Sequence, residues 1–65
     1  MDAQTLRARR GRAGLTQSEL GRALGVGRRH ITRLEAGETP ISRSMEIAIN
    51  FVFDSNGDEN GNDNN

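Results

Sequence analysis

Aliphatic residues recur three or four positions apart in four stretches of the chain, and glycines or the single proline lie between these stretches. This spacing predicts amphipathic helices over about 2–13, 17–24, 28–36 and 43–53. No stretch alternates between apolar and polar residues for long enough to form a strand. The pattern therefore predicts an all-α fold, a compact bundle of four short helices.

The predicted helix ends carry capping residues. Thr16 followed by Glu19 predicts a capping box at the start of the second helix, and Ser42 is expected to cap the fourth. Gly25 is expected to take the positive φ that a tight turn between helices requires. Gly21 is expected where the second and third helices cross, because a missing side chain lets two backbones approach closely. The expected core is aliphatic and consists of Leu6, Leu15, Leu20, Leu24, Val26, Ile31 and Leu34.

The composition changes after Phe53, and so does the charge. Residues 1–53 contain all nine arginines and five acidic residues, whereas residues 54–65 contain four acidic residues, no basic residue and no apolar one. The formal net charge of zero therefore hides a basic domain, 1–53, and an acidic tail, 54–65, that is expected to be disordered. A basic domain suits a polyanionic partner.

The size and composition limit the function. A chain of 65 residues without cysteine forms one small domain with no disulfide. There is no apolar stretch of about 18 residues or signal segment, so we expect a soluble, cytoplasmic protein that has no membrane partner. No cluster of acidic residues, histidine or serine resembles a catalytic or metal site. We therefore expect no enzyme activity, no cofactor and no metal.

The middle of the chain resembles the lambda-repressor/Cro-like (XRE-type) helix-turn-helix family. The residues that carry the resemblance are Arg10, Gly14-Leu15-Thr16-Gln17, Glu19-Leu20, Leu24-Gly25-Val26, Ile31, Arg33, Glu35 and Gly37. It covers roughly residues 6–53 and implies a domain that places one helix in the DNA major groove. Gly21 stands where alanine is usual, and the family's fifth helix has no counterpart.

The predicted third helix has a polar arc that the resemblance turns toward the DNA bases. At 100° per residue, its arginines and threonine fall within about 140°, and Ile31 and Leu34 lie on the other side. These candidate base contacts are Arg28, Arg29, Thr32 and Arg33. Because arginine pairs well with guanine O6 and N7, we expect G·C pairs in each half-site. In an isolated helix the same arginines could simply solvate an exposed face.

The resemblance also implies contacts to the phosphate backbone and one structural ion pair. The resemblance implies phosphate contacts by Gln17 and Arg43, and Thr16 and His30 are further candidates. The alternative for His30 is a side chain that is simply exposed to solvent. The free N–H groups where the second helix begins suit an anion. Arg10 and Glu35 match a family ion pair that ties the first helix to the third, in which a guanidinium grips a carboxylate with two hydrogen bonds.

The fourth predicted helix carries two apolar stripes. One stripe is expected to cover the core and consists of Met45, Ala48, Ile49 and Val52. The second contains Ile47 and Phe51, joined by Phe53, and is a candidate homodimer interface. The alternative is that the helix lies between others and hides both stripes.

We expect a sequence-specific repressor that binds double-stranded DNA as a homodimer on a palindromic operator. The small size and the resemblance favour an autoregulatory protein of a phage or mobile element, and the chain has no second domain to bind a small-molecule effector. Two alternatives stay open: the antitoxin of a toxin–antitoxin pair, and a protein-interaction module that kept the fold without DNA binding. The polar tail disfavours the first, and the arginine face disfavours the second.

Overall fold

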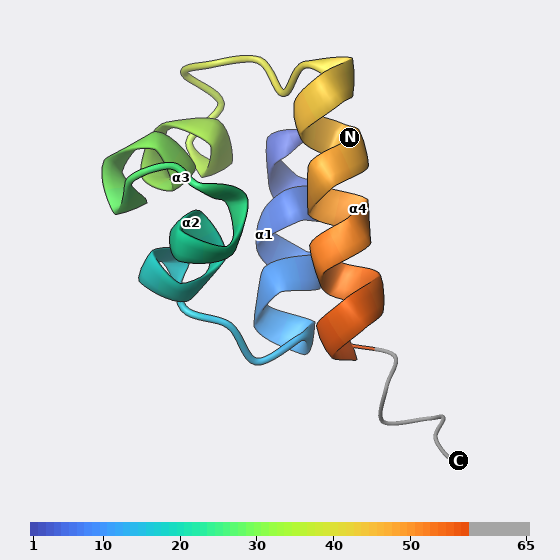
Figure 1. Cartoon of the computed structure of the whole chain (residues 1–65). Helices are drawn as coiled ribbons and strands as arrows, with labels where there is room; N and C mark the ends of the chain where they lie inside the picture. The colour runs from blue at the N-terminus through green and yellow to red at the C-terminus, as the bar shows by residue number, and fades with distance from the viewer. Residues whose placement is uncertain (58–65) are drawn as a thin grey trace, which may run out of the picture.

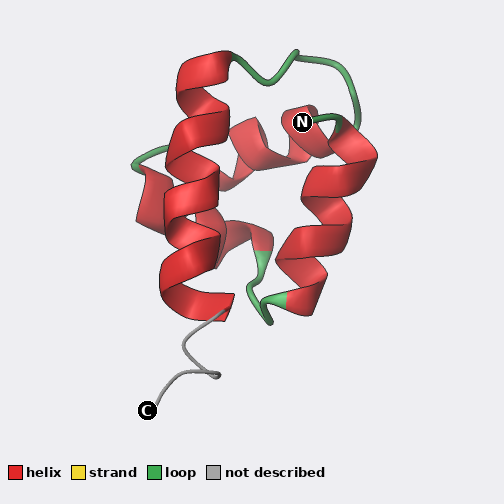
Figure 2. Cartoon of the chain, turned by 90° about the vertical axis from the view of Figure 1, so that its right-hand side faces the viewer, coloured by secondary structure: helices red, strands yellow, loops and turns green. Residues whose placement is uncertain are grey.

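A computed structural model describes residues 1–57 of the chain. In this part all regular structure is helical (Figures 1 and 2). The helices are α1 (Ala3–Arg12), α2 (Gln17–Leu24), α3 (Arg28–Glu35) and α4 (Arg43–Gly57). In Figure 1, α2 and α3 form one side of the molecule, α4 forms the other, and α1 lies beside α4. The predicted all-α bundle of four helices is confirmed.

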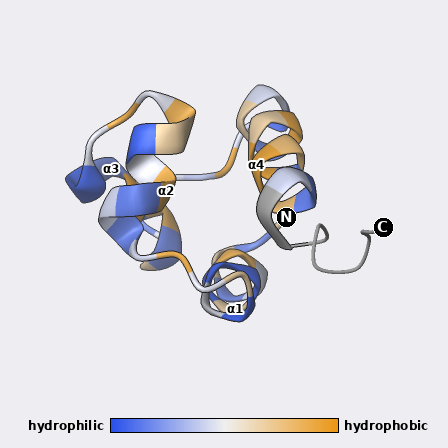
Figure 3. Cartoon of the chain, turned by 60° about the horizontal axis from the view of Figure 1, so that its bottom comes forward, coloured by the Kyte–Doolittle hydropathy of each residue, from blue (hydrophilic) through white to orange (hydrophobic). Residues whose placement is uncertain are grey.

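Every helix contributes to one apolar core, in which all buried side chains but that of Phe53 are aliphatic. The apolar side chains that are at most 8% exposed are those of Leu6, Leu20, Ile31, Leu34, Ile49, Val52 and Phe53. Three further residues expected in the core, Leu15, Leu24 and Val26, are partly buried against it. In Figure 3 the ribbon of α4 is orange over several turns, because this helix is rich in apolar residues. Three of them, Ile49, Val52 and Phe53, are buried in the core.

Side-chain caps define the starts of α2 and α4, as the sequence predicts. The Thr16 Oγ1 accepts a hydrogen bond from the Glu19 backbone N–H at 3.0 Å, and the Glu19 carboxylate accepts one from the Thr16 N–H at 2.8 Å. The Ser42 Oγ accepts a hydrogen bond from the Met45 N–H at 3.1 Å. The capping box is thus complete, and three backbone N–H groups at these two helix starts are satisfied by side chains.

The turn between α2 and α3 depends on two glycines. Gly25 has a φ of 79°, in the left-handed region. The Val26 N–H then donates to the Gly21 carbonyl at 2.8 Å. A Cβ at Gly21 would lie 2.8 Å from the Val26 carbonyl oxygen. The close approach expected at Gly21 therefore involves the turn that follows α2, and not α3 itself.

Replacing Gly25 with alanine is expected to lower the free energy of unfolding by about 1–2 kcal/mol, because an L-residue is strained in the left-handed region. No heavy atom lies within 4 Å of the position its Cβ would occupy, so the loss would come from the backbone alone. Urea denaturation measures it. Gly11→Ala is the matched control, since Gly11 lies inside α1 with equally open space around it and should gain about 0.5–1 kcal/mol. A Gly25→Ala protein as stable as the wild type would contradict this account of the turn.

Helix α4 continues beyond the predicted domain boundary at Phe53. It ends at Gly57, so the first four residues of the expected disordered tail are helical. Val52 and Phe53 are buried and hold the preceding turn on the core, and extending a helix that is already nucleated is far easier than starting one. The rest of the expected disordered tail, 58–65, lies outside the described residues.

Candidate nucleic-acid interface

Helix α3 exposes one polar face and buries the other. Its four candidate base contacts are all exposed, namely Arg28, Arg29, Thr32 and Arg33. Ile31 and Leu34, on the other face, are at most 1% exposed. Within residues 1–57, the three guanidinium groups of this face make no hydrogen bond or ion pair with another side chain. They are therefore available to an external acceptor, and the helix presents them on a rigid backbone.

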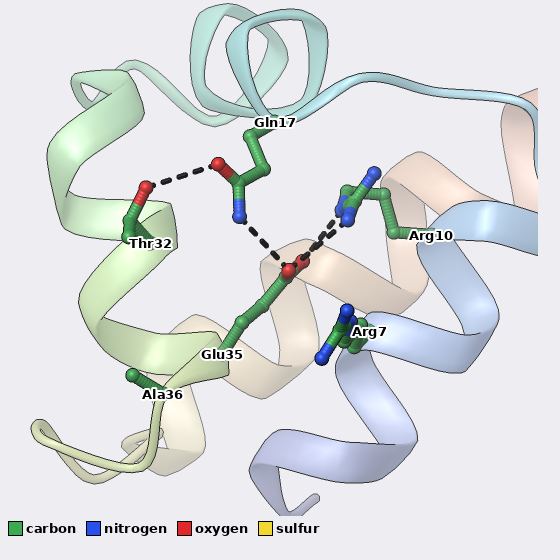
Figure 4. Close-up of a pocket in the computed structure, with 6 residues that line it drawn as sticks. All are labelled: Arg7, Arg10, Gln17, Thr32, Glu35 and Ala36. Carbon is green, nitrogen blue, oxygen red and sulfur yellow. Dashed lines mark hydrogen bonds and ion pairs between the residues drawn. The ribbon is translucent and has the colours of Figure 1, made fainter.

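A chain of side-chain hydrogen bonds links the exposed face of α3 to helix α1 (Figure 4). The Thr32 Oγ1 lies 3.0 Å from the Gln17 Oε1, to which it donates, and 3.1 Å from the Arg28 carbonyl oxygen. The Gln17 Nε2 donates to the Glu35 Oε1 at 3.0 Å. Gln17 is therefore a bridge between the surface of α3 and the interior of the domain.

Arg10 and Glu35 form a bidentate ion pair at the inner end of this chain. The Arg10 Nε donates to the Glu35 Oε2 at 2.6 Å, and its Nη2 donates to the Oε1 at 3.1 Å. The remaining Nη1 donates to the Leu15 carbonyl at 2.8 Å. The side chains are 18% and 4% exposed, respectively. This pair joins α1, the following loop and α3, as the resemblance implies.

The surroundings of Glu35 keep it ionised. Burial by itself raises the pKa of Glu35, but hydrogen bonds from Arg10 and Gln17 and the charges of Arg10 and Arg7 act the other way. The net result is a pKa below the usual 4.5. The carboxylate therefore stays charged at neutral pH and accepts hydrogen bonds from both neighbours.

The same residues line an open pocket of about 240 Å³ between α1, α2 and α3. Its lining consists of Arg7, Arg10, Gln17, Thr32, Glu35 and Ala36. Arg7 is exposed and makes no side-chain hydrogen bond or ion pair within the described residues. No role was predicted for Arg7 from the sequence. The signal was its position three residues before Arg10, which places both arginines on one face of α1.

The candidate phosphate contacts lie on three helices. Thr16 and Gln17 are adjacent at the start of α2, where the exposed Thr16 closes the capping box. His30 is half-buried on the flank of α3. Arg43 is exposed as the first residue of α4, beyond the loop that follows α3. The structure thus brings Gln17 into contact with Thr32 and leaves Arg43 on a separate helix.

The expected dimer residues divide between the surface and the core. Ile47 is 60% exposed and Phe51 is 72% exposed, as a surface stripe requires. Phe53 is only 5% exposed, and the Arg9 Cζ lies 4.9 Å from the centre of its ring. Our expectation for Phe53 is therefore corrected: it is a core residue. It follows Phe51 by two positions, about 200° around the helix, and so points to the opposite side.

The capped α2, the tight turn and the exposed arginine face of α3 define a DNA-binding protein of the helix-turn-helix class. A family model described as a helix-turn-helix domain matches residues 3–49, and the chain belongs to this family. Neither the curated proteins nor the solved structures gave a match to the chain. No helix within residues 1–57 is long and apolar enough to cross a bilayer.

Proposed function

We propose that the protein is a sequence-specific repressor that inserts α3 into the major groove of double-stranded DNA. The observation that supports this most is the set of unpaired guanidinium groups on the exposed face of α3. Arginine is the side chain best suited to bidentate contacts with guanine and with phosphate. The proposed base contacts are Arg28, Arg29, Thr32 and Arg33.

Residues around the start of α2 would hold the helix on the phosphate backbone. Thr16 and Gln17 lie where the N-terminal dipole of α2 attracts an anion. His30 and Arg43 would add contacts on either side of the groove. Such contacts position the domain without reading the sequence, so their loss should weaken binding to all DNA sequences alike.

The exposed stripe of Ile47 and Phe51 would join two copies into a homodimer. A two-fold dimer presents two recognition helices about 34 Å apart and reads a palindromic operator across successive major grooves. Occupying that operator would block the polymerase. The family resemblance favours control of the protein's own promoter, as in a phage or mobile element.

The test is selection of DNA sites from random and genomic fragments, including the DNA upstream of the gene, followed by titration of the selected site across a salt series. We expect a palindrome with G·C pairs in each half-site. The logarithm of the binding constant should fall linearly with the logarithm of the salt concentration. Failure to bind any duplex at low salt would overturn the proposal and favour a protein-interaction module.

A further inference from the structure

Helix α4 carries a continuous outer stripe that no other described helix covers. The stripe consists of Arg43, Ile47, Phe51 and Asp54, all of which are exposed. At 100° per residue these positions fall within about 80° of one another. The buried residues of the helix lie on the opposite side. The stripe is thus separate from the face that holds α4 on the core.

The stripe has opposite charges at its two ends and apolar side chains between them. Arg43 begins the helix, Asp54 lies in its last turn, and neither makes a side-chain hydrogen bond or ion pair within residues 1–57. They are 11 residues apart, about 16 Å along the axis, so they cannot pair within one chain. Ile47 and Phe51 lie one turn apart between them.

We propose that α4 packs on the α4 of a second copy in an antiparallel, two-fold arrangement. Ile47 then contacts Phe51 of the second copy, and Arg43 pairs with Asp54 of the second copy. The midpoint between Ile47 and Phe51 and the midpoint between Arg43 and Asp54 both lie near residue 49. A single two-fold axis that passes close to this residue can therefore form both kinds of contact at once. The inference rests on the homodimer proposed above, and adds its orientation and its charged residues.

The order of the side chains favours a second copy as the occupant. A two-fold interface uses one surface patch twice, so the patch must be complementary to itself when reversed. The stripe meets this condition, because it has a basic residue at one end, an acidic residue at the other end and two apolar residues between them. Reversing it therefore places opposite charges against each other. A parallel arrangement would instead oppose Arg43 to Arg43 and Asp54 to Asp54, and like charges disfavour that pairing.

The apolar and charged residues would have different tasks. Exposed ion pairs add little affinity, so the contact of Ile47 with Phe51 provides most of the attraction and the charges select the orientation. The interface is one face of one helix, smaller than that of a stable complex, and we expect micromolar or weaker association that DNA reinforces. Arginine has five N–H donors, so a pair with Asp54 leaves Arg43 able to reach a phosphate.

The position of the stripe suits DNA binding. In Figure 1, α3 lies across the molecule from α4, and α2 packs on both of these helices. Pairing through α4 would therefore leave the arginine face of α3 open in both copies.

Charge reversal tests the orientation. Arg43→Glu and Asp54→Arg would each replace two attractive pairs per dimer with two repulsive ones, and should weaken dimerisation about tenfold. The double variant restores both pairs in reversed sense and should dimerise within about twofold of the wild type. Sedimentation equilibrium without DNA measures the dissociation constants. Both reversals suit the helix dipole, and thermal melting checks that each variant is folded.

Two controls make the result specific. Arg22→Glu changes the net charge as Arg43→Glu does, but on α2, and should leave the dissociation constant unchanged. Phe51→Glu should abolish the dimer while the melting curve stays cooperative. Single reversals without effect, or a double variant as weak as the singles, would overturn the antiparallel pairing. A wild type that stays monomeric up to millimolar concentration would overturn it too, whereas failure of the DNA-binding proposal would show separately, as a lack of binding to any duplex.

Discussion

Replacing Glu35 with alanine is expected to lower the free energy of unfolding by about 2–3 kcal/mol and the melting temperature by roughly 10–20 °C. The reason is that the Arg10 guanidinium, only 18% exposed, would lose its bidentate partner. Gln17 would also lose the acceptor that holds its amide nitrogen. The loss is smaller than the roughly 3–5 kcal/mol of a fully buried pair, because Arg10 keeps some contact with water. Thermal and urea denaturation measure both quantities.

Glu38→Ala is the matched control for this change. Glu38 is exposed just after α3 and makes no side-chain hydrogen bond or ion pair in the described part of the chain. Its replacement should stay within about 0.5 kcal/mol of the wild type. Equal, small effects of the two substitutions would show that the ion pair does not hold α1 to α3.

The pH dependence gives a second measurement on the same pair. Because the pKa of Glu35 is lower in the folded chain than its usual 4.5, its contribution is complete above that value and is lost as the pH falls through the folded pKa. The difference in unfolding free energy between the wild type and Glu35→Gln should therefore be largest at neutral pH and shrink as the pH falls below 4.5. A difference that is constant with pH would contradict the ion-pair account.

Replacing Arg28 with alanine is expected to weaken binding to the selected operator by about 1–3 kcal/mol, or roughly five- to 150-fold, and to relax the preference at one base position. Arg28 is the first residue of α3, and its guanidinium is exposed and unpaired within residues 1–57. It would therefore reach the proposed groove without first breaking an internal contact. Fluorescence anisotropy with the operator and with single-base variants measures the loss and the change in preference.

Two further substitutions separate base reading from general attraction. Measured on DNA with a single half-site, where dimerisation does not contribute, Arg43→Ala should weaken binding to operator and unrelated sequence by similar factors and make the salt dependence shallower, as expected for a phosphate contact. Arg22→Ala removes the same charge from α2, outside the proposed contacts, and should have the smallest effect. If Arg28→Ala weakened all sequences equally, Arg28 would be a phosphate contact and not a base contact.

Short-range signals account for the parts of the fold that the sequence predicts well. The capping box of Thr16 and Glu19 is closed by atoms three residues apart, and the turn at Gly25 needs only one positive φ. The end of α4 was predicted at Phe53, but the helix continues to Gly57, because a contact distant in sequence decides where it ends. The polar residues after Phe53 read locally as a loop, and the burial of Val52 and Phe53 that anchors the last turns is a tertiary contact.

In the candidate site, too, some features follow from short-range signals and others depend on tertiary contacts. The arginine face of α3 follows from helical periodicity alone, since Ile31 and Leu34 determine which side turns inward. The hydrogen bond from Gln17 to Glu35 does not, because it joins residues 18 positions apart whose separation depends on how α2 packs on α3. The pocket beside Arg7 likewise exists only where three helices meet.

The sequence by itself determined the number and order of the described helices, the caps of α2 and α4 and the exposed basic face, because these depend on neighbours within one or two turns. Only the tertiary structure decided that Gln17 bridges Thr32 to the Arg10–Glu35 pair. The tertiary structure also decided that Phe53 lies in the core and Phe51 on the surface. These outcomes depend on how α1 and α4 pack around the helix-turn-helix, and that packing brings together residues far apart in the chain.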